Sequence, residues 1–308
     1  MKSIHLIVLM VFTISFNSYA CLNGETKLLK NGTYIYEDDD DFFPDGHRFY
    51  VDNYPNLLSE LRSLYQKTKD LDYLSDVGYV LTIQKKYQEA LGIYFEIEKK
   101  QPNRYSTASN LGTIYELLGN NKKALEWISK AVRINPKSHS NSEWLHVKIL
   151  EAKINGEQNI NSEFLINASF GNDTIPKSHL NKKERLKLIK ALYYQLNERV
   201  SFIQPKDKII ALLLFELGNL TYLNKDYFTA EQCYESAVAY GNTNPLIPAR
   251  IKLTNDEIYY REVRQKNATS KKLYQVEKNN NYLKIIIGAL FIAVLGLTII
   301  LFRKRKRK

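Results

Sequence analysis

Several residue types and motifs are scarce in this chain, and their scarcity excludes most catalytic classes. Its 308 residues include two cysteines, Cys21 and Cys233, which are too few and too far apart for a disulfide framework or a zinc site. No two of its 13 glycines are spaced Gly-x-Gly, which excludes the dinucleotide fingerprint and the kinase-type loop. Walker, His-Glu-x-x-His, Gly-x-Ser-x-Gly and Cys-x-x-Cys patterns are also missing. We therefore expect no enzyme activity, no catalytic residue and no cofactor.

Histidines are few and scattered, at positions 5, 47, 139, 146 and 179. His139, Glu143 and His146 could share one side of a helix, which leaves a metal site or an ordinary helix edge as alternatives. Because metal ligation usually needs three or four converging groups, we adopt the helix edge and expect no metal site.

The N-terminus has the features of a secretory signal. Lys2 precedes an apolar run over residues 4–16, and Ser18-Tyr19-Ala20 is a small-x-small cleavage site. Residues 1–20 are therefore predicted to be a signal peptide. Cleavage after Ala20 would expose Cys21, so lipidation of Cys21 remains an alternative, although Ser18 stands where a lipobox usually has leucine.

The C-terminus predicts a membrane anchor. Residues 285–302 are an apolar run interrupted only by Thr298, and we expect a transmembrane helix over 283–302. Six basic residues at 303–308 place the tail in the cytoplasm by the positive-inside rule. The chain would then be a single-pass membrane protein whose N-terminal domain is extracytoplasmic, or periplasmic in a Gram-negative cell. Without Lys2 and the six tail residues the net charge falls from +11 to +4, which gives no case for nucleic-acid binding.

An internal repeat organises the middle of the chain. Residues 71–104 align without gaps on residues 105–138, an offset of 34 residues, and a further copy covers 211–244. Equivalent positions are Gly78 and Gly112, Ala90 and Ala124, Pro102 and Pro136, with Gly218 and Ala230 in the further copy. Small residues let two helices approach closely, and proline cannot continue a helix, so each copy is expected to be a helix hairpin ending near its proline.

This repeat resembles the tetratricopeptide repeat (TPR) family, whose unit is a helix-turn-helix of 34 residues. The resemblance implies an all-α helical solenoid, preceded by a small N-terminal hairpin or loop segment and followed by one C-terminal transmembrane helix. We divide the chain into a signal peptide (1–20), an N-terminal acidic segment (21–56), a capping helix (57–70), TPR units (71–104, 105–138 and 211–244), a degenerate repeat and loop (139–178), a helix (179–210), a juxtamembrane stalk (245–281), the transmembrane helix (283–302) and a cytoplasmic basic tail (303–308).

By the same resemblance, the first helix of each unit lines a concave groove that binds a protein or peptide. The groove residues would be Asp72, Ser75, Asp76, Tyr79, Ser106, Ser109, Asn110 and Thr113. Only Asn110 matches the clamp with which TPR co-chaperones hold a C-terminal carboxylate, so that ligand is not expected. Because the groove is polar and slightly acidic, we expect it to prefer polar or cationic peptide segments, and a merely solvated face is the alternative.

The stretch from Tyr36 to His47 contains four consecutive aspartates, Asp38 to Asp41, and then the turn Pro44-Asp45-Gly46. A bound cation and a solvated turn are both open, and we adopt the turn, because consecutive side chains point in different directions and calcium loops space their ligands alternately. Upstream, a small hairpin is expected around Lys30-Asn31-Gly32.

The function that the sequence predicts is a non-enzymatic, membrane-anchored TPR scaffold that binds a protein or peptide partner on the extracytoplasmic side. The first alternative is a sensory or regulatory ectodomain that signals through a membrane partner. A second is a hydrolase that uses the carboxylates of Asp38 to Asp41, although paired carboxylates catalyse only in a shaped site.

Overall fold

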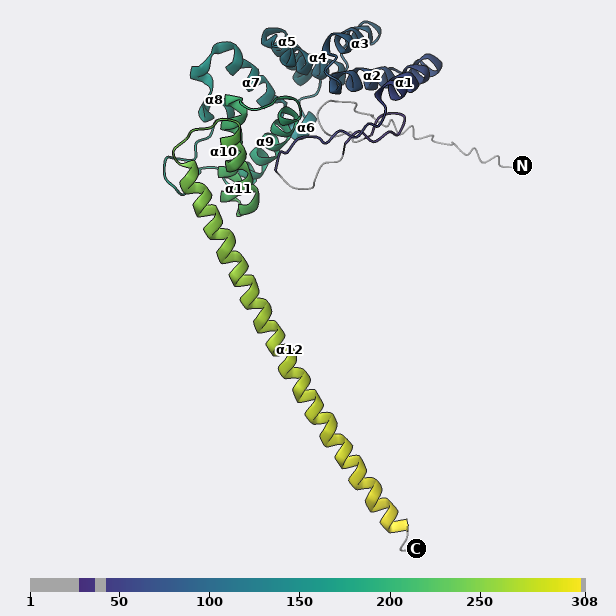
Figure 1. Cartoon of the computed structure of the whole chain (residues 1–308), viewed down its shortest axis with the longest axis vertical. Coiled ribbons are helices and arrows are strands. Elements are labelled where there is room, and N and C mark those ends of the chain that lie inside the picture. Colours follow the sequence, from purple (N-terminus) through teal and green to yellow (C-terminus); the bar gives the residue numbers. More distant parts are fainter. Residues whose placement is uncertain (1–27, 37–42, 306–308) are drawn as a thin grey trace, which may run out of the picture. The chain divides into compact units, whose positions relative to one another are not determined.

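The structure, a computed structural model, describes residues 28–36 and 43–305. Helices make up most of this part, and its β pairing consists of two isolated bridges, Leu28 with Tyr34 and Tyr36 with Phe49. The elements are α1 (Tyr54–Thr68), α2 (Leu71–Ile83), α3 (Tyr87–Lys100), α4 (Tyr105–Leu117), α5 (Asn121–Ile134), α6 (Ser138–Asn141), α7 (Glu143–Asn155), the 3-10 helix η1 (Glu157–Asn159), α8 (Ser162–Ile166), α9 (Lys182–Phe202), α10 (Lys208–Leu223), α11 (Tyr227–Ala239) and α12 (Ile247–Arg305) (Figure 1).

Three helix pairs share one hairpin design: α2 with α3, α4 with α5, and α10 with α11. Each pair is joined by three residues, and the middle one has a positive φ in all three turns: Lys85 at 60°, Gly119 at 77° and Lys225 at 64°. The same turn at the same place in each unit confirms the helical repeat array that the resemblance to the TPR family implies. The described chain is a TPR-like all-α array.

Close packing inside each hairpin explains the repeated glycines. A Cβ built on Gly78 would lie 2.7 Å from the ring of Tyr94, and one on Gly218 would lie 2.6 Å from the ring of Tyr234. A Cβ on Gly112 would lie 2.5 Å from Ile128. In each unit the group that requires glycine is therefore a large buried side chain 16 residues later, on the second helix, and not the conserved-size alanine that the sequence suggests.

The first part of the array shares one hydrophobic cluster. Leu61, Val77 and Ile97 are fully buried there, and they belong to α1, α2 and α3. Ile35 and Tyr36, which precede α1, lie in the same cluster and are 0% and 1% exposed. The residues before the first helix are therefore part of the folded core.

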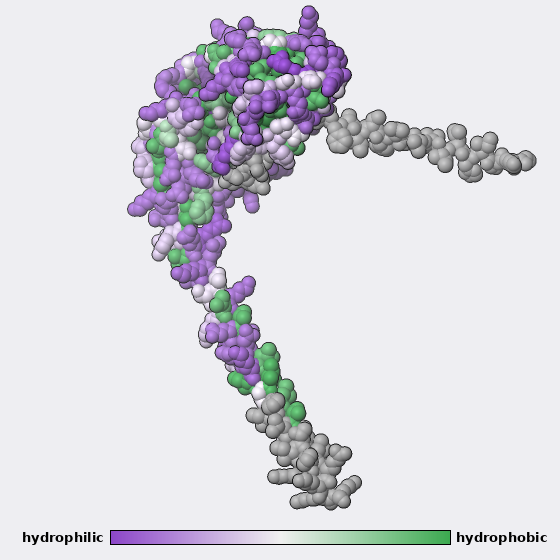
Figure 2. Space-filling view, turned by 45° about the vertical axis from the view of Figure 1, so that its right-hand side comes forward, coloured by the Kyte–Doolittle hydropathy of each residue, from purple (hydrophilic) through white to green (hydrophobic). Residues whose placement is uncertain are grey.

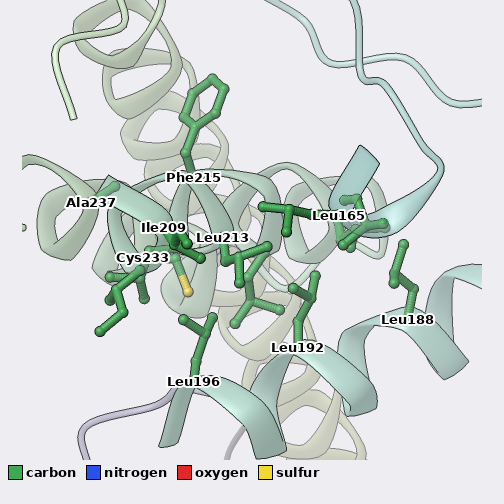
Figure 3. Packing of buried hydrophobic residues seen from close by; sticks show 14 of the residues in the cluster. Leu165, Leu188, Leu192, Leu196, Ile209, Leu213, Phe215, Cys233 and Ala237 are labelled. Atoms are coloured by element: carbon green, nitrogen blue, oxygen red, sulfur yellow. The ribbon is translucent and has the colours of Figure 1, made fainter. Parts of the chain in front are cut away.

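A second cluster holds the later helices together, and Figure 3 shows part of it. Leu192 and Leu196 of α9 point toward Leu213 of α10 and Cys233 of α11 (Figure 3). Cys233 is 0% exposed, as expected for a small apolar residue inside a helix.

The degenerate unit after Pro136 does not form a regular hairpin. Its first helix is split into α6 and α7 at Ser142, and α7 ends at Gly156, where φ is 99°. Only the short helix α8 follows before α9. The long helix α9 packs against α6, α7 and α10, and it takes the place that a regular second helix would have taken.

One prediction about the C-terminal part is wrong. We expected a separate transmembrane helix over 283–302 and hence a single-pass membrane protein. These residues are instead the end of one helix that begins at Ile247, and in the described part of the chain no helix is both long and apolar enough to cross a membrane. The unbroken apolar run whose side chains the structure describes extends only from Ile285 to Leu290, far short of the roughly 20 residues that a spanning helix needs.

The described chain divides into two compact units between Ile251 and Lys252. Within the second unit, side chains are mostly hydrophilic at first, and apolar ones gather toward the last described residues (Figure 2). The predicted signal peptide, Cys21, the aspartates at 38–41 and residues 306–308 of the tail lie outside the described residues.

Candidate functional site

The eight predicted groove residues lie on the inner helices α2 and α4, and most of them are buried in this structure. Only Asp72 and Thr113 are partly exposed. The buried ones are Ser75 (0% exposed), Asp76 (1%), Tyr79 (4%), Ser106 (8%), Ser109 (1%) and Asn110 (0%). Their role as partner-binding residues stays a prediction, and the question is what covers them.

Part of the answer is the N-terminal segment, by which we mean residues 28–36 together with 43–50. The Lys30 main-chain N–H donates to Asp76 Oδ2 at 2.7 Å. The Lys30 ammonium lies 3.3 Å from Asp70 and 3.5 Å from Asp72. The turn that presents Lys30 is closed by Leu29 and Gly32, whose backbones hydrogen-bond at 2.8 Å. A basic residue of the chain itself therefore occupies the acidic end of α2.

The other end of the N-terminal segment is bound to α9. The N–H of Gly46 donates to Asn197 Oδ1, and the N–H of His47 donates to Ser201 Oγ, both at 2.8 Å. His47 Nε2 lies 2.9 Å from Glu198 Oε1, and both side chains are buried. Three neighbouring side chains of one helix thus bind two consecutive residues of an extended chain.

The two halves of the N-terminal segment also bind each other. The rings of Tyr36 and His47 stack with centroids 3.9 Å apart. The Tyr50 N–H donates to the Ile35 carbonyl at 2.7 Å. Phe49 continues the contact to the ring of Phe202 on α9, at 5.7 Å between centroids.

A buried ionic cluster joins α4, α7 and α9 beside this segment. Glu116 lies 2.6 Å from His146 Nε2, 2.8 Å from the ammonium of Lys153 and 3.3 Å from the guanidinium of Arg199. Burial raises the pKa of Glu116, but Arg199, Lys153 and His146 outweigh burial and hold that pKa well below its usual range. A permanently ionised Glu116 is therefore the common anchor of three helices.

The space next to this cluster is small. A cavity of about 20 Å³, room for roughly one water molecule, separates α4 from α9. Its lining includes Thr113, Glu116, His146, Glu198, Arg199 and Phe202. The predicted groove residue Thr113 therefore faces α9 across a gap too small for a ligand.

A second buried group contains the histidines that the sequence places near a possible metal site. Glu143 accepts a hydrogen bond from the Tyr105 hydroxyl at 3.1 Å and pairs with His139 Nδ1, while His146 Nδ1 lies 3.8 Å away. Burial raises the pKa of Glu143, but His139, His146 and Tyr105 lower it to about 2. Among the residues that the structure describes, no group of three His, Cys, Asp or Glu is arranged to hold a metal ion. This group links α4, α6 and α7 through hydrogen bonds and charge.

Asp76 differs from these glutamates, because little positive charge reaches it. Burial raises its pKa to about 7, and the hydrogen bond from the Lys30 main chain opposes that rise. The N–H of whatever chain lies at Lys30 therefore decides how easily Asp76 ionises.

Sequence reasoning found the α2 part of this site and missed the α9 part. The positions of Asp72 and Asp76 within the repeat were sufficient to place them on the inner face. Asn197 and Ser201 carried a usable signal, because residues four apart lie on one face of a helix. Their ligand did not, since Gly46 and Asn197 are 151 residues apart in the chain.

Comparisons with known proteins add little. No protein-family model matches the chain, and no curated protein matches it. Among solved structures, a tetratricopeptide repeat protein from Parabacteroides merdae ATCC 43184 is similar, with 16% sequence identity over 65% of this chain and 92% of that chain. The TM-score is 0.32, so the description of the fold depends on the repeated hairpins of this chain itself.

Proposed function

We propose that this protein is a non-enzymatic scaffold whose TPR-like array binds an extended, basic peptide segment of a protein partner. The inner helices α2 and α4 and the crossing helix α9 form the binding face. Asp70, Asp72 and Asp76 select the charge of the ligand, and the remaining predicted groove residues line the same face.

One observation carries this proposal: the face already holds an extended chain with a basic residue. The Lys30 ammonium lies between Asp70 and Asp72, and its N–H is bound by Asp76. Hydrogen bonds that involve an ionised partner are about twice as strong as neutral ones, so these carboxylates favour a cationic ligand. The contacts to α9 also use main-chain donors, which any extended peptide can supply.

The test begins with a photo-crosslinking residue in place of Thr113, which lies on α4 and is partly exposed. The same residue in place of Lys99, which is exposed on the second helix α3, is the control for nonspecific capture. A protein captured only from position 113 is then purified, and its affinity is measured by titration calorimetry.

The decisive comparison uses two double variants of equal charge. Asp70→Asn with Asp72→Asn should weaken binding by about tenfold or more, because at least one charge-assisted contact worth about 1.4 kcal/mol is lost. Glu89→Gln with Glu126→Gln removes two exposed carboxylates from second helices and should leave the affinity unchanged. A captured partner that binds both variants equally well would contradict the proposal.

A further inference from the structure

The face of α9 that carries Asn197, Glu198 and Ser201 recognises one short sequence of the chain itself. Residues 43–50, called the clip below, make their buried contacts there through Gly46 and His47. Asp45, Arg48 and Tyr50 are exposed, and Phe43 and Phe49 are only half-buried. The clip is therefore fixed to α9 mainly by hydrogen bonds and one buried ring.

Glycine is required at position 46 for two reasons. Its φ is 85°, a conformation that residues with a side chain rarely adopt. A Cβ at this position would also lie 3.2 Å from the Ser201 nitrogen and 3.2 Å from Val200 Cγ2. Only a glycine lets the chain come this close to α9.

The next residue must fill a defined slot. The His47 ring is paired with Glu198 at 2.9 Å on one side and stacked on Tyr36 at 3.9 Å on the other. Tyr36 itself is held in the hydrophobic cluster of α1 and α2, so this side of the slot does not depend on the clip. The slot therefore selects an imidazole that follows a glycine.

We propose that the clip is an exchangeable internal ligand, and that a partner enters by offering an extended segment with a Gly-His pair that displaces it from α9. This inference rests on the proposed function and names the partner chemistry at one end of the site. The Lys30 half of the N-terminal segment stays in place, since Leu29, Ile35 and Tyr36 are buried in the core. In the free protein the clip closes the α9 end of the face, and the partner must compete with it.

The experiment uses the full chain and a fluorescent synthetic peptide of residues 43–50, with binding followed by fluorescence anisotropy. The Gly46→Val variant cannot seat its own clip, whereas its α9 is unchanged. Gly32→Val is the matched control, because Gly32 has a similar φ of 86° and no atom within 4 Å of a built Cβ. Hydrogen exchange at residues 46 and 47 reports whether the clip has left α9.

The expected result is that the peptide binds Gly46→Val at least about tenfold more tightly than it binds wild type or Gly32→Val, which corresponds to about 1.4 kcal/mol of removed competition. A peptide carrying the same glycine-to-valine change should bind none of the three proteins. If Gly46→Val does not fold, His47→Ala replaces it, since it loosens the clip and leaves Asn197, Glu198 and Ser201 intact.

Equal affinity for wild type and Gly46→Val would overturn the inference, and so would a failure of the peptide to bind a variant whose clip amides exchange freely. Either result would make the clip a fixed part of the fold. The proposed function is tested separately at Asp70 and Asp72 with a captured partner, so one can fail while the other stands.

Discussion

At the residue scale, the contact between Gly78 and Tyr94 shows why the repeat keeps its glycine. Tyr94 is 0% exposed, and its hydroxyl donates to the Ser75 carbonyl at 3.1 Å and accepts from Asn110 Nδ2 at 2.8 Å. The ring cannot move away from α2 without breaking these hydrogen bonds. Asn110, which the resemblance places in the groove, therefore works in this structure as a link between α3 and α4.

This geometry predicts opposite effects for two glycine-to-alanine variants. Gly78→Ala should lower the free energy of unfolding by about 1–3 kcal/mol, because its Cβ would overlap a ring held in place. Gly92→Ala, at an exposed helical site where a built Cβ has no atom within 4 Å, should raise it by up to about 1 kcal/mol through helix propensity. Urea unfolding of both variants measures the difference. A stabilised Gly78→Ala protein would show that the ring relaxes and that the packing argument is wrong.

At the element scale, α9 depends on one buried carboxylate for its attachment to α4 and α7. The side chains of Glu116 and Arg199 are each 5% exposed. The ion pair of Glu157 with Lys208 also joins two elements, η1 and α10, but its side chains are 77% and 71% exposed. These two pairs separate the effect of burial from that of charge.

We expect Glu116→Gln to destabilise the array by about 3 kcal/mol, because it leaves the buried Arg199 without its anion. Glu157→Gln should have no measurable effect, since exposed ion pairs are screened by water and salt. Denaturant unfolding gives the free energies, and hydrogen exchange along α9 shows whether protection is lost there first. Equal effects of the two variants would rule out the anchoring role of Glu116.

At the scale of the whole molecule, two buried carboxylates give the stability opposite dependences on pH. The pKa of Glu143 is lowered from 4.5 to about 2, so its contribution is complete above pH 4.5 and is lost as the pH falls toward 2. The pKa of Asp76 is raised from 3.8 to about 7, so stability falls as the pH rises from about 4 through 7.

The prediction is a stability maximum on the acidic side of neutrality, with each slope assigned to one residue. Glu143→Gln should flatten the decline below pH 4.5, and Asp76→Asn should flatten the decline between pH 4 and 7, because asparagine keeps an acceptor for the Lys30 N–H without a charge. The measurement is urea unfolding from pH 2.5 to pH 8. If Asp76→Asn is less stable than wild type at pH 8 by as much as at pH 4, its ionisation does not carry the alkaline slope.

How far prediction from sequence succeeds depends on the range of the interactions. The hairpins were predictable because their signals lie within 34 residues: a glycine, a large residue 16 positions later, and a proline after the second helix. The inner-face positions of Asp72 and Asp76 followed from the same repeat. The membrane prediction failed where a local apolar run was treated as a separate helix, although the structure continues it from the helix that begins at Ile247.

The sequence by itself determined an all-α repeat array, since backbone turns and close helix packing are dictated by residues near one another in the chain. Only the tertiary structure decided that the inner face is covered. That outcome depends on contacts such as Gly46 with Asn197 and Glu116 with Arg199, which join residues 151 and 83 positions apart. Contacts of this kind form only after the array has brought α2, α4 and α9 together, so no local pattern announces them.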